Sequence, residues 1–211
     1  MADPGDASNQ YFASDPSVAS DRRTITLALP DLTVDLVTDA GVFSGDRVDP
    51  GTKLLLLDGA RPPAGPGTYL DIGCGYGPIA VALARRAPDA VVWAVDVNER
   101  ARRLCAENAL AAGVGDRVRV VAPDDVPAEI AFDGIWSNPP IRIGKPALHL
   151  LLTTWLDRLA PDGTAHLVVQ KHLGADSLAD WLRRTGFGVE RIGSRMGYRL
   201  LEVRPATMAT P

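Results

Sequence analysis

From residue 66 onwards, short apolar runs alternate with longer segments whose apolar residues recur at helical spacing. The apolar runs predict β-strands at 68–72, 91–97, 118–122, 134–137 and 164–170. The segments with helical periodicity lie between them, at 78–86, 99–112, 146–159 and 175–184. Strands that alternate with helices predict a parallel sheet covered by helices on both faces. The expected fold class is therefore α/β, with a mostly parallel sheet.

Both ends of the chain depart from this alternation. Residues 189–203 read as two strands joined by a tight turn at Met196-Gly197, with no helix between them, which makes the last strand antiparallel. Residues 24–38 alternate apolar and polar positions around Pro30-Asp31, as a β-hairpin does. A glycine-flanked loop then leads into a short apolar helix that starts near Pro50, because proline suits the first turn of a helix.

These patterns divide the chain into three parts. Residues 1–23 lack periodicity and are rich in Asp, Ser, Ala and Pro, which predicts an arm that is mobile unless it docks, with Tyr11 and Phe12 as candidate anchors. Residues 24–65 hold the hairpin, the loop and the short helix, and we expect them to pack on the core. Residues 66–205 form the α/β unit. A length of 211 residues suits one compact unit with such an extension.

Composition limits the class of protein. The chain is 46% hydrophobic and 23% charged, which is ordinary for a soluble globular protein. No apolar stretch reaches the roughly 18 residues of a spanning helix, and the N-terminus is acidic and polar, so we expect a cytoplasmic protein. Two cysteines, Cys74 and Cys105, are too few for a disulfide framework, and the three histidines have no metal-site spacing. We expect free thiols and no metal.

The net charge of −4 is unevenly distributed. Residues 1–60 carry four basic and ten acidic side chains, whereas residues 142–211 carry ten basic and six acidic ones. A basic C-terminal third could meet phosphates, although charged runs are more often only a solvated surface. The arginines considered for this role are Arg183, Arg184, Arg191, Arg195 and Arg199. The acidic chain as a whole argues against coating nucleic acid irrespective of sequence.

Glycine and polar residues follow the predicted strands, and open α/β sheets bind ligands beyond the carboxyl ends of their strands. After the first strand comes DIGCGYGP, in which Asp71 closes the strand and three glycines, 73, 75 and 77, are spaced by two. Such glycines let the backbone turn sharply and approach a ligand. Pro78 stands where a dinucleotide fingerprint needs its third glycine, which argues against NAD.

The next three strands end in acceptors. Asp96 ends the second strand, where a carboxylate can accept both hydroxyls of a ribose. Asp124 and Asp125 follow the third strand, at a position that suits an adenine edge. The fourth strand is followed by Asn138-Pro139-Pro140, a stiff stretch because proline fixes φ and has no N–H but keeps its carbonyl. The alternative is a plain strand stop before a helix.

The segments DIGCGYG, VDVNERA and SNPP, in this order, resemble the class I S-adenosylmethionine-dependent methyltransferases. GVFSGDRVDPGTKLLL and NPPIRIGK narrow the resemblance to the methyltransferase small-domain family, whose members include ribosomal RNA guanine-N2 methyltransferases. QYFASDPSV is similar to the start of stand-alone members, so the resemblance covers nearly the whole chain. It implies a Rossmann-like sheet, S-adenosylmethionine as cofactor, and ribosomal RNA or a ribosomal particle as substrate, with neither membrane nor metal. The oligomeric state stays open, with a monomer favoured.

The resemblance also implies roles for individual residues. The side-chain oxygen of Asn138 and the carbonyl of Pro139 are expected to accept both hydrogens of a target amine and so aim its lone pair at the methyl group. The implied cofactor contacts are Asp71, Gly73, Cys74, Gly75, Gly77, Asp96, Val97, Asn98, Asp124, Asp125 and Asn138. The implied substrate contacts are Phe43, Pro140, Ile141, Arg142 and Lys145.

One position departs from the family pattern. Members that act on DNA adenine or protein glutamine usually have an aromatic residue after NPP, and here Ile141 stands in its place. Arg142 and Lys145 could compensate by guanidinium stacking or phosphate contact, or could simply face solvent before a helix. The resemblance as a whole nevertheless implies a guanine amine in ribosomal RNA as the favoured target. Adenine, a glutamine side chain, and a nucleoside-binding domain without turnover stay open as alternatives.

Overall fold

The computed structural model describes residues 18–205, so the anchor role expected for Tyr11 and Phe12 lies outside the described residues. The strands are β1 (Arg23–Leu29), β2 (Leu32–Thr38), β3 (Thr68–Ile72), β4 (Val91–Val95), β5 (Val118–Val121), β6 (Phe132–Ser137), β7 (Leu159–Gln170), β8 (Gly188–Arg195) and β9 (Tyr198–Arg204). The α-helices are α2 (Pro50–Asp58), α3 (Pro78–Arg86), α4 (Glu99–Ala111), α5 (Lys145–Leu156) and α6 (Ala175–Arg184). Short 3-10 turns occur at η1 (Pro123–Asp125), η2 (Ile141–Ile143) and η3 (Lys171–Leu173).

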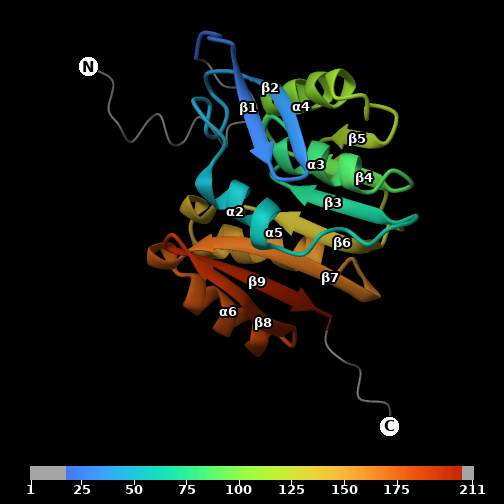
Figure 1. Cartoon of the computed structure of the whole chain (residues 1–211). Coiled ribbons are helices and arrows are strands. Elements are labelled where there is room, and N and C mark those ends of the chain that lie inside the picture. Colours follow the sequence, from blue (N-terminus) through green and yellow to red (C-terminus); the bar gives the residue numbers. More distant parts are fainter. Residues whose placement is uncertain (1–17, 206–211) are drawn as a thin grey trace.

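One seven-stranded sheet organises the molecule, in the order β5-β4-β3-β6-β7-β9-β8 (Figure 1). The strands from β5 to β7 are parallel to their neighbours, and β9 is antiparallel to both β7 and β8. Met196 and Gly197 join β8 to β9 with φ values of 52° and 80°, a backbone that matches the twist of a tight hairpin. The expected mostly parallel α/β sheet with an antiparallel last strand is confirmed.

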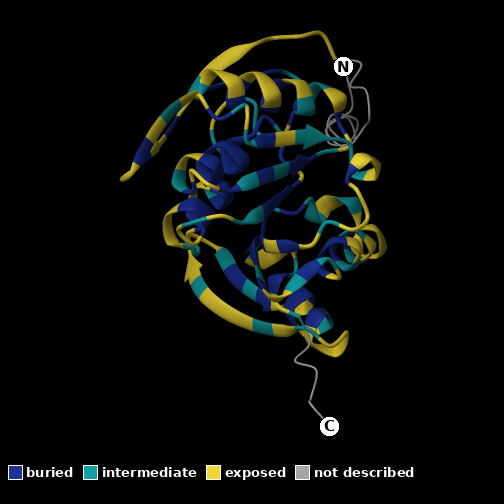
Figure 2. Ribbon diagram, turned by 90° about the vertical axis from the view of Figure 1, so that its right-hand side faces the viewer, coloured by how far each residue is buried: buried dark blue, intermediate teal, exposed yellow. Residues whose placement is uncertain are grey.

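The sheet buries both of its faces, as parallel sheets do. Side chains alternate along each strand, so in β3 Tyr69 faces one hydrophobic cluster while Leu70 and Ile72 face the other. Helices α2, α3 and α4 cover the first face, and α5 and α6 cover the second. Figure 2 shows the buried residues concentrated in the strands and on the inner sides of these helices.

The expected N-terminal hairpin is present as a separate two-stranded sheet of β1 and β2. Leu27 and Leu36 are fully buried and share a cluster with Leu55 of α2 and Leu83 of α3. The residues that precede the hairpin are held as well, because the side chain of Ser20 and the backbone N–H of Asp21 donate to the Asp39 carboxylate. The extension therefore packs on the same face as α3 and α4.

The boundary between α5 and β7 differs from the expectation by several residues. The periodicity predicted a helix over 146–159, but α5 ends at Leu156 and β7 already begins at Leu159. Leu159 pairs with Phe132 of β6, and the backbone N–H of Phe132 donates to the Arg158 carbonyl. Pairing with a neighbouring strand outweighs local helical spacing at such a boundary. Among residues 18–205 no helix is long and apolar enough to cross a membrane.

Candidate active site

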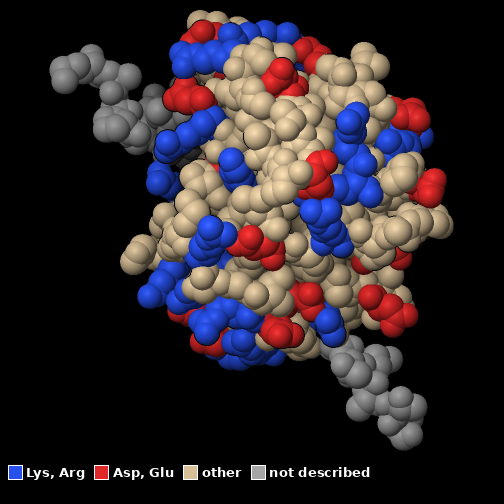
Figure 3. All heavy atoms as spheres, in the orientation of Figure 1, with Lys and Arg blue, Asp and Glu red and all other residues tan. Residues whose placement is uncertain are grey.

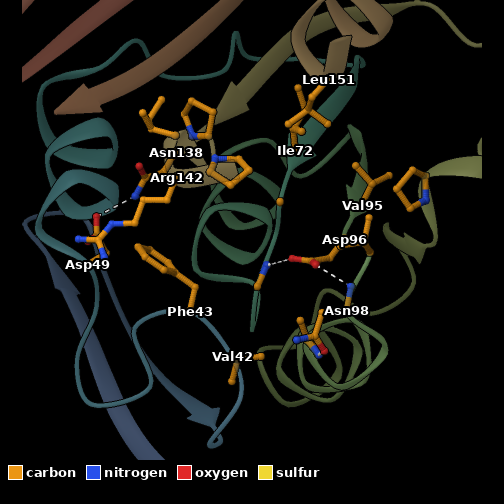
Figure 4. Close-up of a pocket in the computed structure, with 18 of the residues that line it drawn as sticks. Val42, Phe43, Asp49, Ile72, Val95, Asp96, Asn98, Asn138, Arg142 and Leu151 are labelled. Carbon is orange, nitrogen blue, oxygen red and sulfur yellow. Dashed lines mark hydrogen bonds between the residues drawn. The ribbon is translucent and has the colours of Figure 1, made fainter. Parts of the chain in front are cut away.

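A cavity of about 360 Å³ opens beyond the carboxyl ends of β3, β4 and β6 (Figure 4). Most residues singled out by the sequence line it: Phe43, Gly73, Gly75, Asp96, Val97, Asn98, Asn138, Pro139, Pro140, Ile141 and Arg142. Further lining residues come from several elements: Val42, Asp49, Ile72, Val95, Ala101, Pro123, Leu151, Trp155, Gln170, Leu173 and Tyr198. A mostly apolar cavity with a few convergent polar groups is typical of a small-molecule site.

The glycine loop between β3 and α3 forms one wall of the cavity. Gly73 and Gly75 have φ values of +71° and +55°, a left-handed backbone that favours glycine. A Cβ on either residue would meet no protein atom within 4 Å, so it would occupy open space at the cavity. Gly77 instead allows α3 and α4 to pack closely, because a Cβ there would lie 2.8 Å from the Cys105 sulfur of α4. Cys74 is buried and, like Gly77, does not line the cavity.

Asp96, at the end of β4, forms the next wall. One carboxylate oxygen accepts the N–H of Gly75 at 2.9 Å and the other accepts the N–H of Asn98 at 2.9 Å. These bonds tie the loop after β3 to the loop after β4, and Figure 4 shows both as dashed lines. Burial raises the pKa of Asp96. Each oxygen keeps a further lone pair, so the carboxylate can still accept from the hydroxyls of a ribose. Open glycine positions beside a carboxylate fit a nucleoside cofactor such as S-adenosylmethionine.

Besides Cys74 and Gly77, three predicted cofactor residues do not line the cavity: Asp71, Asp124 and Asp125. Asp71 is fully buried behind the glycine loop, where one of its oxygens accepts the N–H of Ala80 in α3 at 3.0 Å. The other oxygen has no hydrogen-bond partner among the described residues, and burial raises the pKa of Asp71 to about 8. Asp124 and Asp125 are exposed in η1 and do not line the cavity, whereas Pro123 of the same turn does.

Asn138, which follows β6, forms an acceptor-rich corner with the start of α2. Its side-chain nitrogen donates to Asp49 Oδ1 at 2.7 Å and to Thr52 Oγ1 at 3.1 Å. Within residues 18–205 nothing donates to the side-chain oxygen of Asn138. The Pro139 carbonyl already accepts the N–H of Ile141 at 2.8 Å and keeps one lone pair for a ligand. Asn138 and Pro139 therefore both line the cavity, and each has an oxygen that can accept a further hydrogen bond.

Asp49, Gln170 and Tyr198 line the cavity but were not singled out by the sequence, although signals for the first two existed. Asp49 stands within the GVFSGDRVDPGT segment that carries the resemblance. Gln170 ends β7, so the rule that ligands lie beyond strand ends also points to it. Tyr198 pairs with Gln170 across the antiparallel contact of β7 and β9, and only that pairing brings it to the cavity.

The cations that follow β6 differ from those of α6, β8 and β9 in their ion pairing. In Figure 3 basic side chains gather over the lower part of the molecule, where α6 and β8 lie in Figure 1. Arg183, Arg195 and Arg199 there form ion pairs with Asp180, Asp58 and Asp176, respectively. By contrast, Arg142 and Lys145 are exposed and form no ion pair within the described part of the chain. Arg142 lines the cavity and Lys145 does not.

The sequence profile of the methyltransferase small domain family matches residues 33–202. The chain is 34% identical over 200 residues to the uncharacterized protein YbxB of Bacillus subtilis (strain 168), covering 93% of this chain and 98% of that protein. It is also 35% identical over 160 residues to the ribosomal RNA small subunit methyltransferase C of Shewanella pealeana, covering 73% of this chain. The match spans 46% of the Shewanella protein, so this chain corresponds to about half of that relative.

A solved structure supports the fold. The 16S rRNA N2 G1207 methyltransferase of T. Thermophilus, in complex with AdoMet and guanosine, superposes with a TM-score of 0.73 at 23% sequence identity. The superposition covers 90% of this chain and 52% of the Thermophilus chain. Together these matches confirm the enzyme class and the S-adenosylmethionine cofactor implied by the sequence. The chain belongs to the methyltransferase small domain family.

Proposed function

We propose that this chain methylates the exocyclic N2 amine of a guanine in ribosomal RNA. The observation that carries the proposal is the corner around Asn138, where the side-chain nitrogen is tied to Asp49 and the side-chain oxygen has no donor within residues 18–205. This oxygen and the Pro139 carbonyl are two acceptors at the wall of a cavity suited to a nucleoside cofactor. Two adjacent acceptors match the two hydrogens of a primary amine.

The residues of this chain have mainly to position the reactants. When bound, S-adenosylmethionine supplies a methyl group on a positively charged sulfur, so the acceptor needs correct placement more than activation. Asp96 and the backbone around Gly73 and Gly75 would hold its nucleoside part. Apolar side chains of Leu151 and Trp155 line the same cavity and exclude water from it.

The lone pair of a guanine N2 amine is delocalised into the ring, which makes the amine a poor nucleophile. If Asn138 Oδ1 and the Pro139 carbonyl accept its two hydrogens, the lone pair is turned towards the methyl group. Both acceptors become more favourable as positive charge develops on the nitrogen, so they act most strongly in the transition state. The stiff backbone of two consecutive prolines keeps the carbonyl in place.

Phe43 supplies the aromatic face that Ile141 lacks. Its side chain lines the cavity, and the residue is 47% exposed, which is high for a phenylalanine. In Figure 4 Phe43 lies between the Asn138–Asp49 pair and Asp96, where a target base would have to enter. A flipped base is typically held by stacking on such a ring.

The choice of guanine and of ribosomal RNA rests on relatives. The Shewanella proteins are named ribosomal RNA small subunit methyltransferases, and the Thermophilus structure is titled as an N2 guanine methyltransferase. The same two acceptors would also suit adenine or a glutamine amide. Identification of the methylated product therefore tests the proposal directly.

The experiment is methyl transfer from tritiated S-adenosylmethionine to naked ribosomal RNA and to small ribosomal subunits, followed by mass spectrometry of the digested nucleosides. We expect label in N2-methylguanosine. Label in N6-methyladenosine or in the protein fraction would overturn the substrate assignment. No transfer to either preparation, while the chain still binds S-adenosylmethionine, would point to a substrate other than ribosomal RNA.

A further inference from the structure

Asp49 links the start of α2 to the strand end that carries Asn138. It is the N-cap residue of α2, and its Oδ1 accepts the N–H of Thr52 at 3.0 Å. The same oxygen accepts the side-chain nitrogen of Asn138 at 2.7 Å, a contact between residues 89 positions apart in the chain. This contact is one of the dashed lines in Figure 4. A carboxylate that both caps a helix and binds an asparagine amide has two separable functions.

The contact decides which way the Asn138 amide points. The two ends of an asparagine amide have nearly the same shape, so the hydrogen-bond partners determine its orientation. An ionised carboxylate can only accept, and therefore it requires the nitrogen of Asn138 on its side. The opposite orientation would place two oxygens 2.7 Å apart. Thr52 Oγ1 adds a second acceptor for the same nitrogen at 3.1 Å.

Asp49 is itself held rigidly. Gly51, in the first turn of α2, packs against the ring of Tyr198, and a Cβ on Gly51 would lie 2.7 Å from the Tyr198 ring carbon Cε1. The same Cβ would lie 2.9 Å from Asp49 Oδ1, so the carboxylate and the ring flank Gly51. Burial first, and then the charge of Asp49, raise the pKa of Tyr198. Asp49, Asn138 and Tyr198 all line the cavity. The carboxylate thus has a fixed position from which it can orient the amide.

We propose that Asp49 is a positioning residue that fixes the Asn138 amide with its oxygen presented to the target amine. The inference rests on the proposed function, because it assigns the amine to Asn138 Oδ1. Asp49 acts through Asn138, and without it the amide can rotate and present a donor where an acceptor is needed. A hydrogen bond from the amide nitrogen to a carboxylate also polarises the amide and strengthens its oxygen as an acceptor.

Asp49→Ser separates the two functions of this residue. Serine caps helices about as well as aspartate, so the bond to the Thr52 N–H can persist. Its shorter side chain no longer reaches the Asn138 nitrogen. We expect the single-turnover rate of methyl transfer to fall about 10- to 100-fold, with unchanged affinity for S-adenosylmethionine. Asp49→Asn keeps a side-chain oxygen at the same place and is expected to recover most of the rate.

Asp46→Ser is the matched control. Asp46 lies in the same loop, its side chain is 85% exposed, and it pairs with Arg23 rather than with a cavity residue. The control removes the same chemical group from the same segment, and we expect it to leave the rate unchanged.

A double-mutant cycle distinguishes positioning from helix stability. If Asp49 acts through Asn138, then Asp49→Ser causes no further loss in an Asn138→Ala background. If Asp49 affects the rate by a route that does not pass through Asn138, the two losses multiply; if it matters only as the cap of α2, Asp49→Ser alone causes no loss. Independent multiplicative losses, or an unchanged rate in Asp49→Ser alone, would overturn the proposal.

A second readout needs no substrate. The side-chain amide protons of Asn138, followed by ¹⁵N NMR, should be protected from exchange in the wild-type chain and in Asp46→Ser, and labile in Asp49→Ser. Unchanged protection in Asp49→Ser would refute the positioning role even if the substrate is not RNA. Conversely, a methylated product other than N2-methylguanosine would refute the proposed substrate while lost protection still supports the role of Asp49.

Discussion

Replacement of Asp96 by alanine should separate binding of the cofactor from the chemistry. Asp96 accepts backbone N–H groups from Gly75 and Asn98 while its carboxylate lines the cavity. A hydrogen bond to a charged acceptor contributes about 1.5–3 kcal/mol. Since about 1.4 kcal/mol corresponds to a factor of ten, we expect S-adenosylmethionine to bind Asp96→Ala about 10- to 100-fold more weakly.

The same substitution has a cost for stability that must be measured separately. It leaves two backbone donors without their partner, and an unsatisfied buried donor costs about 1–3 kcal/mol unless water replaces the carboxylate. Because both donors border the cavity, water can reach them, and we expect the lower part of this range for each. The variant should unfold at a lower urea concentration but with the same cooperativity.

Calorimetric titration with S-adenosylmethionine measures the affinity of the variant, and urea unfolding measures its stability. Asp89→Ala is the control, because Asp89 is exposed and precedes the amino-terminal end of β4, whereas the cavity lies beyond the carboxyl end of that strand. A cooperatively folded Asp96→Ala that binds as tightly as the control would refute the assignment of the ribose to this carboxylate.

Four further variants test three other parts of the molecule. Asn138→Ala should lower the single-turnover rate by about 10² to 10³ with little change in cofactor affinity, and a near wild-type rate would reject its role. Asn138→Asp should be no milder, because it brings a carboxylate to within hydrogen-bonding distance of Asp49. The double variant Arg142→Ala/Lys145→Ala should weaken RNA binding. The slope of log binding constant against log salt concentration should fall in magnitude by about 0.7 per lost phosphate contact. An unaltered slope in filter binding would show that these residues do not contact RNA. Asp71→Asn should stabilise the fold above pH 5. The pKa of Asp71 in the folded state, about 8, lies above the usual range of aspartate, so the folded state binds this proton more tightly than the unfolded state does. The stability that protonated Asp71 contributes to the wild type is therefore full below about pH 4 and is lost as the pH rises to about 8. Urea titrations of wild type and variant that stay parallel between pH 5 and 8 would contradict this.

The sheet could be predicted because its signals are local. Each strand of the parallel part is a short apolar run, and the helices between them repeat apolar residues at helical spacing, so α3 and α6 begin and end at the residues expected. The tight turn before β9 was visible in Met196-Gly197 for the same reason. The α5–β7 boundary was missed because Leu159 gains a partner strand that no local pattern reveals.

The strand-end rule located the cavity but not every residue in it. In β3, side chains alternate between the two faces, so Asp71 shares its face with Tyr69 and points towards α3 rather than off the end of the strand. After β5, the turn η1 directs Pro123 inwards and leaves Asp124 and Asp125 exposed. A rule based on strand ends identifies the loop, whereas the orientation within the loop depends on the turn that it adopts.

Residues 41–49 explain why the N-terminal extension belongs to the candidate site. The side-chain nitrogen of Asn98, the N-cap residue of α4, donates to the Gly41 carbonyl at 2.9 Å. The side-chain nitrogen of Asn138, at the end of β6, donates to Asp49 at 2.7 Å. Two asparagines that follow different strands thus bind the two ends of one loop, and Phe43 lies between them at the cavity (Figure 4).

This arrangement couples the cofactor side of the cavity to the acceptor side through the loop. Asn98 neighbours Asp96, which faces the expected ribose, whereas Asn138 faces the expected amine. A displacement of the loop at Gly41 would therefore move Phe43 and strain the Asp49 contact that orients the Asn138 amide. Neither the Asn98–Gly41 nor the Asn138–Asp49 hydrogen bond could be predicted from the sequence, because 57 and 89 positions separate the bonded residues. The chemistry of the fourth strand end thus depends on a segment that precedes the first strand of the large sheet.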